Sequence, residues 1–261
     1  MRVFRNFDQT DPIRRPVVTI GSYDGVHLGH RAILDRLGRI AREREGESVV
    51  VTFDPHPRAV LGSPVQLLST LPEKLRLLES AGMDNVIVVD FTREFSRRSP
   101  DDFVRNDLAG RLGLDTLLVG YNHHLGRDKE GDGNFLRTLA DELGFSLQVM
   151  PQQQVGDHKV SSTVIRQIIA AGEVAAAAGY LGGPYLLEGR IGRRGSLGKA
   201  APDKLLPPPG LYAVRAECPG FSPEPLPCRL RIGPRRGLSF VRGSLMPENL
   251  PVTVYFERKE R

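Results

Sequence analysis

Five short runs of apolar residues in the first two thirds of the chain predict buried β-strands. The runs are mostly continuous rather than alternating, which is typical of parallel strands that helices cover on both faces. Stretches with apolar residues at helical spacing separate them, so the pattern predicts a β-α-β succession. The expected strands are residues 17–20, 48–53, 85–90, 116–120 and 145–150. The expected helices are residues 31–44, 67–80, 100–112, 135–144 and 170–179, with a further helix opening at residues 160–166.

The pattern changes near residue 184. From there on, short apolar runs alternate with turn residues and much of the chain's proline, which predicts a small β-barrel or sandwich. Residues 1–183 are therefore expected to form an α/β domain and residues 184–261 a small β domain, while residues 1–15 provide a leading strand or arm. The strands expected in the second domain are residues 186–191, 211–216, 228–232, 238–241 and 252–256.

Charge is unevenly distributed along the chain. The formal net charge is +5, yet residues 188–261 hold 14 Lys and Arg against 7 Asp and Glu, while the rest holds 22 against 24. This basic tail could contact a polyanion, but aromatic residues do not interleave with its arginines, so a solvated basic face is favoured over nucleic-acid binding. The arginines concerned are Arg190, Arg193, Arg194, Arg235 and Arg236.

Two further absences narrow the class of protein. No run of eighteen apolar residues and no signal-peptide core is present, so a cytoplasmic protein without a membrane partner is expected. The two cysteines, Cys218 and Cys228, form neither a CxxC motif nor a disulfide framework.

The first predicted strand leads into a glycine-rich turn and a helix start that carries two histidines. Gly21 and Gly25 allow the backbone to approach a ligand closely, and His27 and His30 lie three residues apart at the first helical turn. Helix N-termini bind phosphate through unpaired N–H groups, so the combination predicts a phosphate site, with Asp24 orienting the turn or contacting the nucleotide. Either histidine alone would be an ordinary cap or surface group, and zinc is disfavoured because no third ligand stands nearby.

Polar residues follow other strands at the sheet edge where open α/β proteins bind ligands. One is a proline-stiffened loop after the second strand, which could equally be a rigid turn, and another contains Asn122. Three hydroxyls and then an arginine open the helix after residue 160. Single hydroxyls are usually caps, but this combination predicts a polyphosphate site. The loop comprises Asp54, Pro55, His56, Pro57 and Arg58, and the helix start comprises Ser161, Ser162, Thr163 and Arg166.

Four of these motifs, taken together and in this order, resemble a known family. Gly-Ser-Tyr-Asp-Gly-Val-His-Leu-Gly-His (21–30) is similar to the signature of the HxGH nucleotidyltransferases. Residues 51–57, 119–126 and 160–166 resemble the FMN adenylyltransferase (FAD synthetase) module of bacterial bifunctional riboflavin kinase/FMN adenylyltransferases. The resemblance covers about residues 15–186 and implies a Rossmann-like nucleotidyltransferase domain with a parallel sheet. Residues 184–261 would then be a truncated, barrel-like riboflavin kinase domain.

The resemblance implies that FMN and ATP are the substrates, that FAD and pyrophosphate are the products, and that Mg²⁺ accompanies ATP. His27, His30 and Arg166 would be catalytic, and Asn122 would lie at the metal. The other expected ATP contacts are Gly21, Asp24, Gly25, Ser161, Ser162 and Thr163, and the expected FMN contacts are Phe53, Pro55, His56, Pro57 and Arg58.

The chain also departs from the family pattern. His123, His124 and Leu125 stand where aromatic residues and an arginine commonly follow Asn122, and residues 190–202 lack the Pro-Thr-Ala-Asn motif of the kinase. Loss of riboflavin kinase activity is therefore expected. A bifunctional enzyme, an enzyme for another phosphorylated acceptor, and a flavin- or nucleotide-binding regulatory protein without turnover stay open as alternatives, and a weak oligomer is compatible with the sequence.

Overall fold

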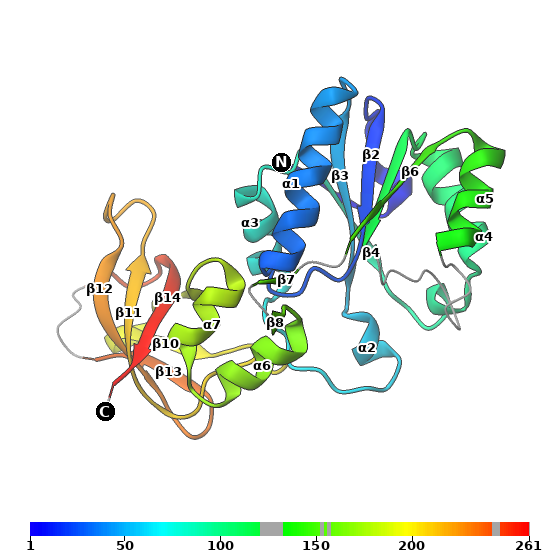
Figure 1. Ribbon diagram of the computed structural model, residues 1–261. Helices are drawn as coiled ribbons and strands as arrows, with labels where there is room; N and C mark the ends of the chain where they lie inside the picture. The colour runs from blue at the N-terminus through cyan, green and yellow to red at the C-terminus, as the bar shows by residue number, and fades with distance from the viewer. Residues whose placement is uncertain (121–132, 152–153, 156–157, 242–245, 261) are drawn as a thin grey trace. The chain divides into compact units, whose positions relative to one another are not determined.

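The computed structural model describes residues 1–120, 133–151, 154–155, 158–241 and 246–260 (Figure 1). Contacts divide the chain into two compact units, each built from several segments. The expected domain boundary between residues 183 and 184 stays a prediction, because a division by contacts does not test where one domain ends along the sequence. The first unit comprises Met1–Tyr23, Gly29–Val65 and Leu75–Gln154, and the second Asp24–Leu28, Gln66–Lys74 and Val155–Arg261.

A parallel six-stranded sheet forms the centre of the first unit, in the order β1-β4-β3-β2-β5-β6. Every pairing between neighbours is parallel, which confirms the α/β class predicted from the continuous apolar runs. The leading segment supplies the edge strand β1. The strands are β1 Arg2–Arg5, β2 Pro16–Ile20, β3 Glu47–Asp54, β4 Asn85–Asp90, β5 Thr116–Gly120 and β6 Ser146–Met150.

Helices cover both faces of this sheet (Figure 1). Alternate strand residues such as Val49 and Val51 join one apolar cluster with Leu108 and Leu136 from the helices of one side. Burial of both faces explains why the strands read as continuous apolar runs. The helices are α1 Leu28–Glu43, α3 Leu71–Ser80, α4 Pro100–Asp102, which continues as a π-helix over Phe103–Arg111, and α5 Gly133–Leu143. Shorter turns are α2 Pro57–Val60 and the 3-10 turns Phe7–Gln9 and Phe95–Arg97.

Helix α3 begins four residues later than its apolar spacing predicts. Leu67 instead forms a parallel bridge with Lys204, in which the Leu67 N–H donates to the Asp203 carbonyl at 2.7 Å. The helix then starts where the Glu73 carboxylate accepts the Thr70 N–H at 2.7 Å. A tertiary backbone pairing has overridden the local helical pattern at residues 67–70.

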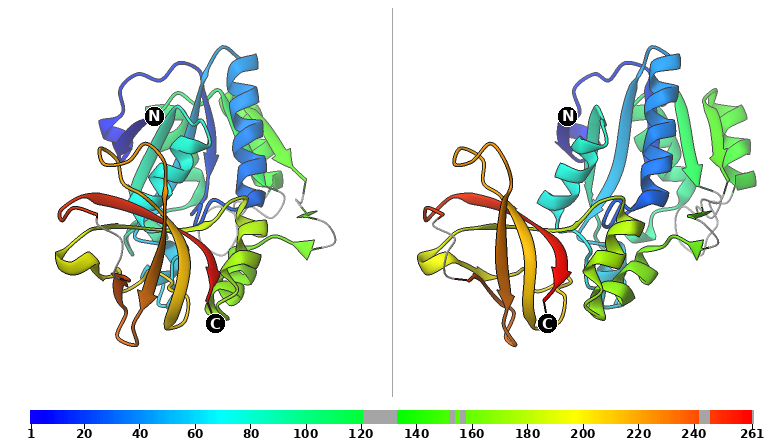
Figure 2. Two further views of the ribbon diagram at one scale, coloured as in Figure 1. Left: turned by 90° about the vertical axis from the view of Figure 1, so that its left-hand side faces the viewer. Right: turned by 60° about the vertical axis from the view of Figure 1, so that its left-hand side comes forward.

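The second unit contains an antiparallel, nearly closed, barrel-like sheet in the order β10-β13-β12-β11-β14-β9 (Figure 2). Five of its strands match the expected runs, and β10 was not anticipated. The strands are β9 Tyr185–Arg190, β10 Ser196–Lys199, β11 Gly210–Glu217, β12 Leu226–Ile232, β13 Gly237–Phe240 and β14 Pro251–Lys259, and a 3-10 turn spans Arg193–Gly195.

Two helices share the core of this second sheet. Ile165 and Ile169 of α6 (Ser162–Ala170) and Leu181 of α7 (Val174–Leu181) belong to one apolar cluster with Tyr212 and Phe256. Gly172, with φ +87°, separates the two helices. A short two-stranded ribbon, β7 Gln154–Val155 and β8 His158–Lys159, precedes α6. Among the described residues, no helix has the length and apolar character needed to span a membrane.

Candidate active site

The glycine turn that follows β2 has a constrained backbone. Gly25 has φ +80°, and a Cβ there would lie 2.8 Å from the Cβ of Leu68, so the turn requires glycine. Val26 has φ +38°, a region that a β-branched residue rarely adopts. Such strain persists only where the surrounding contacts fix the backbone, and it is concentrated at functional sites. The contacts that fix this turn converge on Asp24.

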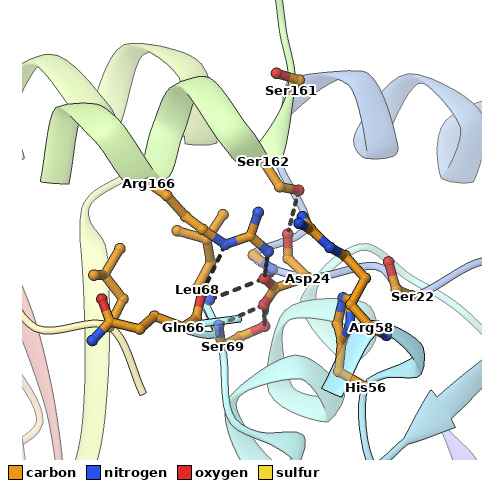
Figure 3. Close-up of polar contacts among 12 residues, drawn as sticks. Ser22, Asp24, His56, Arg58, Gln66, Leu68, Ser69, Ser161, Ser162 and Arg166 are labelled. Atoms are coloured by element: carbon orange, nitrogen blue, oxygen red, sulfur yellow. Dashed lines mark hydrogen bonds and ion pairs between the residues drawn. The ribbon is translucent and has the colours of Figure 1, made fainter. Parts of the chain in front are cut away.

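Asp24 is 1% exposed, and its carboxylate is held by three residues (Figure 3). It accepts the backbone N–H of Leu68 at 3.1 Å and that of Ser69 at 2.9 Å. It also pairs with Nη2 of Arg166 at 2.5 Å. Buried carboxylates need such partners, and these contacts tie the turn at Asp24 to Leu68, Ser69 and Arg166. Whether Asp24 orients the turn or contacts the nucleotide stays a prediction.

The start of helix α6 meets the same turn. Ser161 caps the helix, since its Oγ accepts the Val164 N–H at 3.4 Å, and Ser162 Oγ donates to the Asp24 carbonyl at 3.3 Å. One turn later, Arg166 Nε donates to the Gln66 carbonyl at 2.7 Å, and its side chain is 16% exposed (Figure 3). Two predicted phosphate motifs, more than 130 residues apart in the chain, are thus within hydrogen-bond distance of each other.

His27 lies immediately before α1 and is buried, whereas His30 lies in the first turn of the helix. Burial, with a further contribution from the Arg166 charge, lowers the pKa of His27 to about 4, although Asp24 opposes the shift. The His27 imidazole is therefore neutral at pH 7 in the free protein. The ring of His30 lies 5.0 Å from that of Tyr23, whose hydroxyl is 2.8 Å from the Thr19 hydroxyl.

The depressed pKa of His27 predicts an acid-dependent loss of stability. The unfolded state takes up the proton near the ordinary pKa of 6.5 and the folded state only near 4, so stability from this group is complete above pH 6.5 and falls as the pH drops toward 4. Between pH 7 and pH 4.5 the wild type should lose about 2 kcal/mol more unfolding free energy than His27→Gln. Urea unfolding of both proteins at the two pH values measures the difference, and parallel losses would contradict the predicted pKa shift.

The residues expected to contact FMN lie at the carboxyl end of β3 in the first unit. The Asp54–Pro55 peptide is cis, and His56 caps the one-turn helix α2, where a loop was predicted, by accepting the Arg58 N–H at 3.2 Å. Phe53 is half-buried, with its ring centroid 5.3 Å from that of Phe91. Their assignment to FMN stays a prediction.

Asn122, the predicted metal ligand, lies outside the described residues, as do His123 and His124. Within the described part of the chain, no group of three or more His, Cys, Asp or Glu side chains is arranged to hold a metal ion. The assignment of Asn122 to the metal stays a prediction.

Sequence reasoning missed the groups that hold Asp24 and Arg166. Leu68 and Ser69 act through backbone N–H groups, and Gln66 acts through its carbonyl. Residues 67–69 were assigned to a helix, and main-chain donors carry no side-chain signature. The side chains of Asp24, Ser162 and Arg166, by contrast, were singled out from the sequence.

A parallel six-stranded sheet with helices in the first unit and a nearly closed, barrel-like antiparallel sheet in the second define the class as Rossmann-like with a C-terminal β-barrel-like part. The crystal structure of a macrolide-efflux protein from Streptococcus pneumoniae has this fold. It aligns with a TM-score of 0.82 over 100% of this chain and 90% of that chain, at 22% identity. At that identity the likeness shows the fold alone.

Sequence comparisons define the family. Residues 10–164 match the family model for FAD synthetase. The bifunctional riboflavin kinase/FMN adenylyltransferase of Escherichia coli K12 is 32% identical over 97% of this chain and 84% of its own length. Its counterpart from Listeria monocytogenes is 35% identical over 76% of this chain and 67% of its own. The chain belongs to the FAD synthetase family.

Proposed function

We propose that this protein transfers AMP from ATP to FMN, giving FAD and pyrophosphate, and that it does not phosphorylate riboflavin. A phosphate oxygen of FMN attacks the α-phosphorus of ATP and forms the new P–O–P bond. The bond from the α-phosphorus to the oxygen bridging to the β-phosphorus breaks, and pyrophosphate leaves with that electron pair. Both substrates fit the family.

The observation that carries the proposal is the meeting of the glycine turn and the start of α6 through Asp24, Ser162 and Arg166. A helix N-terminus with hydroxyls and a guanidinium is suited to bind a polyphosphate and to stabilise charge on leaving pyrophosphate. Catalysis of this kind depends mainly on alignment and on charge neutralisation, since little covalent chemistry falls to the protein.

His27 and His30 would contact the triphosphate and stabilise the pentacoordinate transition state. A neutral His27 offers an N–H without bringing a buried positive charge into the free protein. A bound polyanion would favour the protonated imidazole and raise its pKa. Phe53, Pro55, His56, Pro57 and Arg58 are proposed to contact FMN, and Asn122 is proposed to lie near the Mg²⁺ of ATP.

Absence of riboflavin kinase activity is proposed from the sequence of residues 190–202. The resemblance places the kinase's Pro-Thr-Ala-Asn motif there, and this chain has Arg-Ile-Gly-Arg-Arg-Gly-Ser-Leu-Gly-Lys-Ala-Ala-Pro over residues 190–202, without that motif. Without that motif the second sheet lacks the residues that the family uses for ATP and magnesium.

The experiment that tests the proposal offers Mg·ATP with FMN in one reaction and with riboflavin in another, and separates the flavins by chromatography. FAD from FMN and no product from riboflavin is the expected result. No turnover of FMN, particularly with tight FMN binding, would overturn the proposal in favour of a flavin-binding regulatory protein.

A bifunctional enzyme is the second candidate, because the relatives from E. coli and L. monocytogenes are both named as bifunctional and align with most of this chain. Formation of FMN from riboflavin, with the γ-phosphate of ATP transferred to the flavin, would favour it. That outcome would leave the adenylyltransferase proposal intact and would overturn only the proposed loss of kinase activity.

A further inference from the structure

A fully buried ion pair in the second unit has no part in the chemistry described above. Lys204 is 0% exposed and Glu73 1% exposed, and Lys204 Nζ lies 2.7 Å from Glu73 Oε2. The same ammonium donates to the carbonyls of Leu68 at 2.8 Å and Leu186 at 2.9 Å. An ammonium has three N–H donors, so all are used. A buried charge is destabilising unless all its partners are in place. Loss of any one of these contacts should therefore disturb the local structure.

Lys204 also fixes the backbone of the segment that holds Asp24. Leu67 and Lys204 form a β-bridge, in which Leu67 hydrogen-bonds to the two neighbours of Lys204. The Leu67 N–H donates to the Asp203 carbonyl at 2.7 Å, and the Leu67 carbonyl accepts the Leu205 N–H at 2.8 Å. The next residue, Leu68, accepts from Lys204 through its carbonyl and donates to Asp24 through its N–H at 3.1 Å. One residue therefore joins the buried lysine to the buried aspartate.

The Glu73 carboxylate accepts two further hydrogen bonds, and one of them comes from the same segment. Oε2 also accepts the Thr70 N–H at 2.7 Å, and Oε1 accepts the Glu188 N–H of β9 at 2.9 Å. Residues 67–70 are thus fixed at one end by Lys204 and at the other by Glu73. Between them stands Ser69, whose N–H donates to Asp24 at 2.9 Å and whose Oγ accepts the Gly25 N–H at 2.9 Å.

We propose that Lys204 is a positioning residue for nucleotidyl transfer: through Leu68 it holds the Asp24 carboxylate, and through Asp24 the Arg166 guanidinium, in the geometry that receives the polyphosphate. The proposal rests on the proposed function. Lys204 lies in the segment between β10 and β11. On this proposal, that segment supports the nucleotide site, a role distinct from kinase chemistry.

Lys204→Met in the full chain tests the proposal, since methionine keeps the length and apolar stem of lysine but donates nothing. We expect kcat/KM for FAD formation to fall at least tenfold and the Leu68 and Ser69 amides to exchange hydrogen faster. The matched control is Leu230→Ala, which removes a fully buried side chain from β12 of the same unit and lowers stability without touching the Asp24 turn. Unchanged kcat/KM and amide protection in Lys204→Met, or equal losses in Leu230→Ala, would overturn the proposal.

A second variant covers the possibility that the unpaired Glu73 carboxylate prevents folding. Glu73→Gln/Lys204→Met removes both buried charges, so it should fold, yet it still lacks the donor to Leu68. Because glutamine keeps one of the two acceptor oxygens of Glu73, Glu73→Gln alone is the reference. Positioning predicts that kcat/KM and amide protection in the double variant fall below those of Glu73→Gln, whereas equal values would overturn it and show that Lys204 only balances a charge. Hydrogen exchange is measured without substrates, so it tests the role of Lys204 even if the wild-type protein makes no FAD. Absence of FAD formation by the wild type would refute the proposed function and not the structural role of Lys204.

Discussion

Replacing Asp24 with asparagine is expected to lower kcat/KM for FAD formation by at least about a hundredfold, the scale on which a misplaced catalytic group slows an enzyme. Asparagine has one carbonyl oxygen in place of two carboxylate oxygens, so it cannot accept from Leu68, Ser69 and Arg166 together. Removing the charge also leaves Arg166, at 16% exposure, without its buried anion. We therefore expect a loss of about 3 kcal/mol of unfolding free energy, at the low end for a broken buried pair.

Asp101→Asn is the matched control for this substitution. Asp101 pairs with Arg105 one helical turn away at 2.9 Å, but its side chain is 46% exposed. Exposed pairs of this kind contribute little to stability, so activity and stability should both stay near wild type. Steady-state kinetics and urea unfolding on the three proteins give the comparison. Wild-type activity in Asp24→Asn would contradict the role that we assign to the Asp24 contacts.

Replacing His30 with alanine is expected to reduce turnover far more than stability. His30 is proposed to contribute a donor to the transition state, and loss of one such donor costs roughly 10²- to 10³-fold in kcat. The His30 side chain is only partly buried, and its ring centroid lies 5.0 Å from that of Tyr23. The unfolding free energy should therefore change by about 1 kcal/mol or less. Measured kcat and the urea midpoint together test the expectation.

Leu139→Ala, in the same unit, is the control that should lower stability and leave turnover unchanged. Leu139 belongs to α5 and is 2% exposed in the core of the first unit, so its truncation should cost about 2 to 4 kcal/mol of stability and leave kcat near wild type. A His30→Ala protein that lost stability and activity in the same proportion as Leu139→Ala would show that His30 supports the fold rather than the reaction.

Continuous apolar runs were sufficient to predict the parallel sheet, because strands that are buried on both faces are made mostly of apolar residues. Helix starts were harder to predict. Residues 67–70 have the spacing of a helix, yet Leu67 pairs with Lys204 across more than 130 residues of chain, and no local pattern reports such a partner. The same limit explains β10, a four-residue strand whose pairing with β13 depends on a segment about forty residues further on.

At the site, sequence reasoning identified the side chains that carry charge or hydroxyls, because residue type and spacing indicate their chemistry. Asp24, Ser162 and Arg166 were all singled out, and the structure brings these three into contact. The supports could not be found in this way. Leu68 acts through its main-chain N–H, and Ser69 acts through its N–H and a hydroxyl within a segment that has the spacing of a helix. Lys204 lies in a proline-rich tail, where a charged residue would ordinarily be solvated.

The measurement that tests the central claim most directly follows labelled phosphorus from ATP into the flavin. FMN would be incubated with Mg·ATP carrying the label in the α-phosphate, and in parallel with ATP labelled in the γ-phosphate. Adenylyl transfer predicts that the α label appears in FAD, one equivalent for each flavin, and that the γ label appears only in pyrophosphate. Label from the γ-phosphate on the flavin, or no label on it from either ATP, would contradict the account.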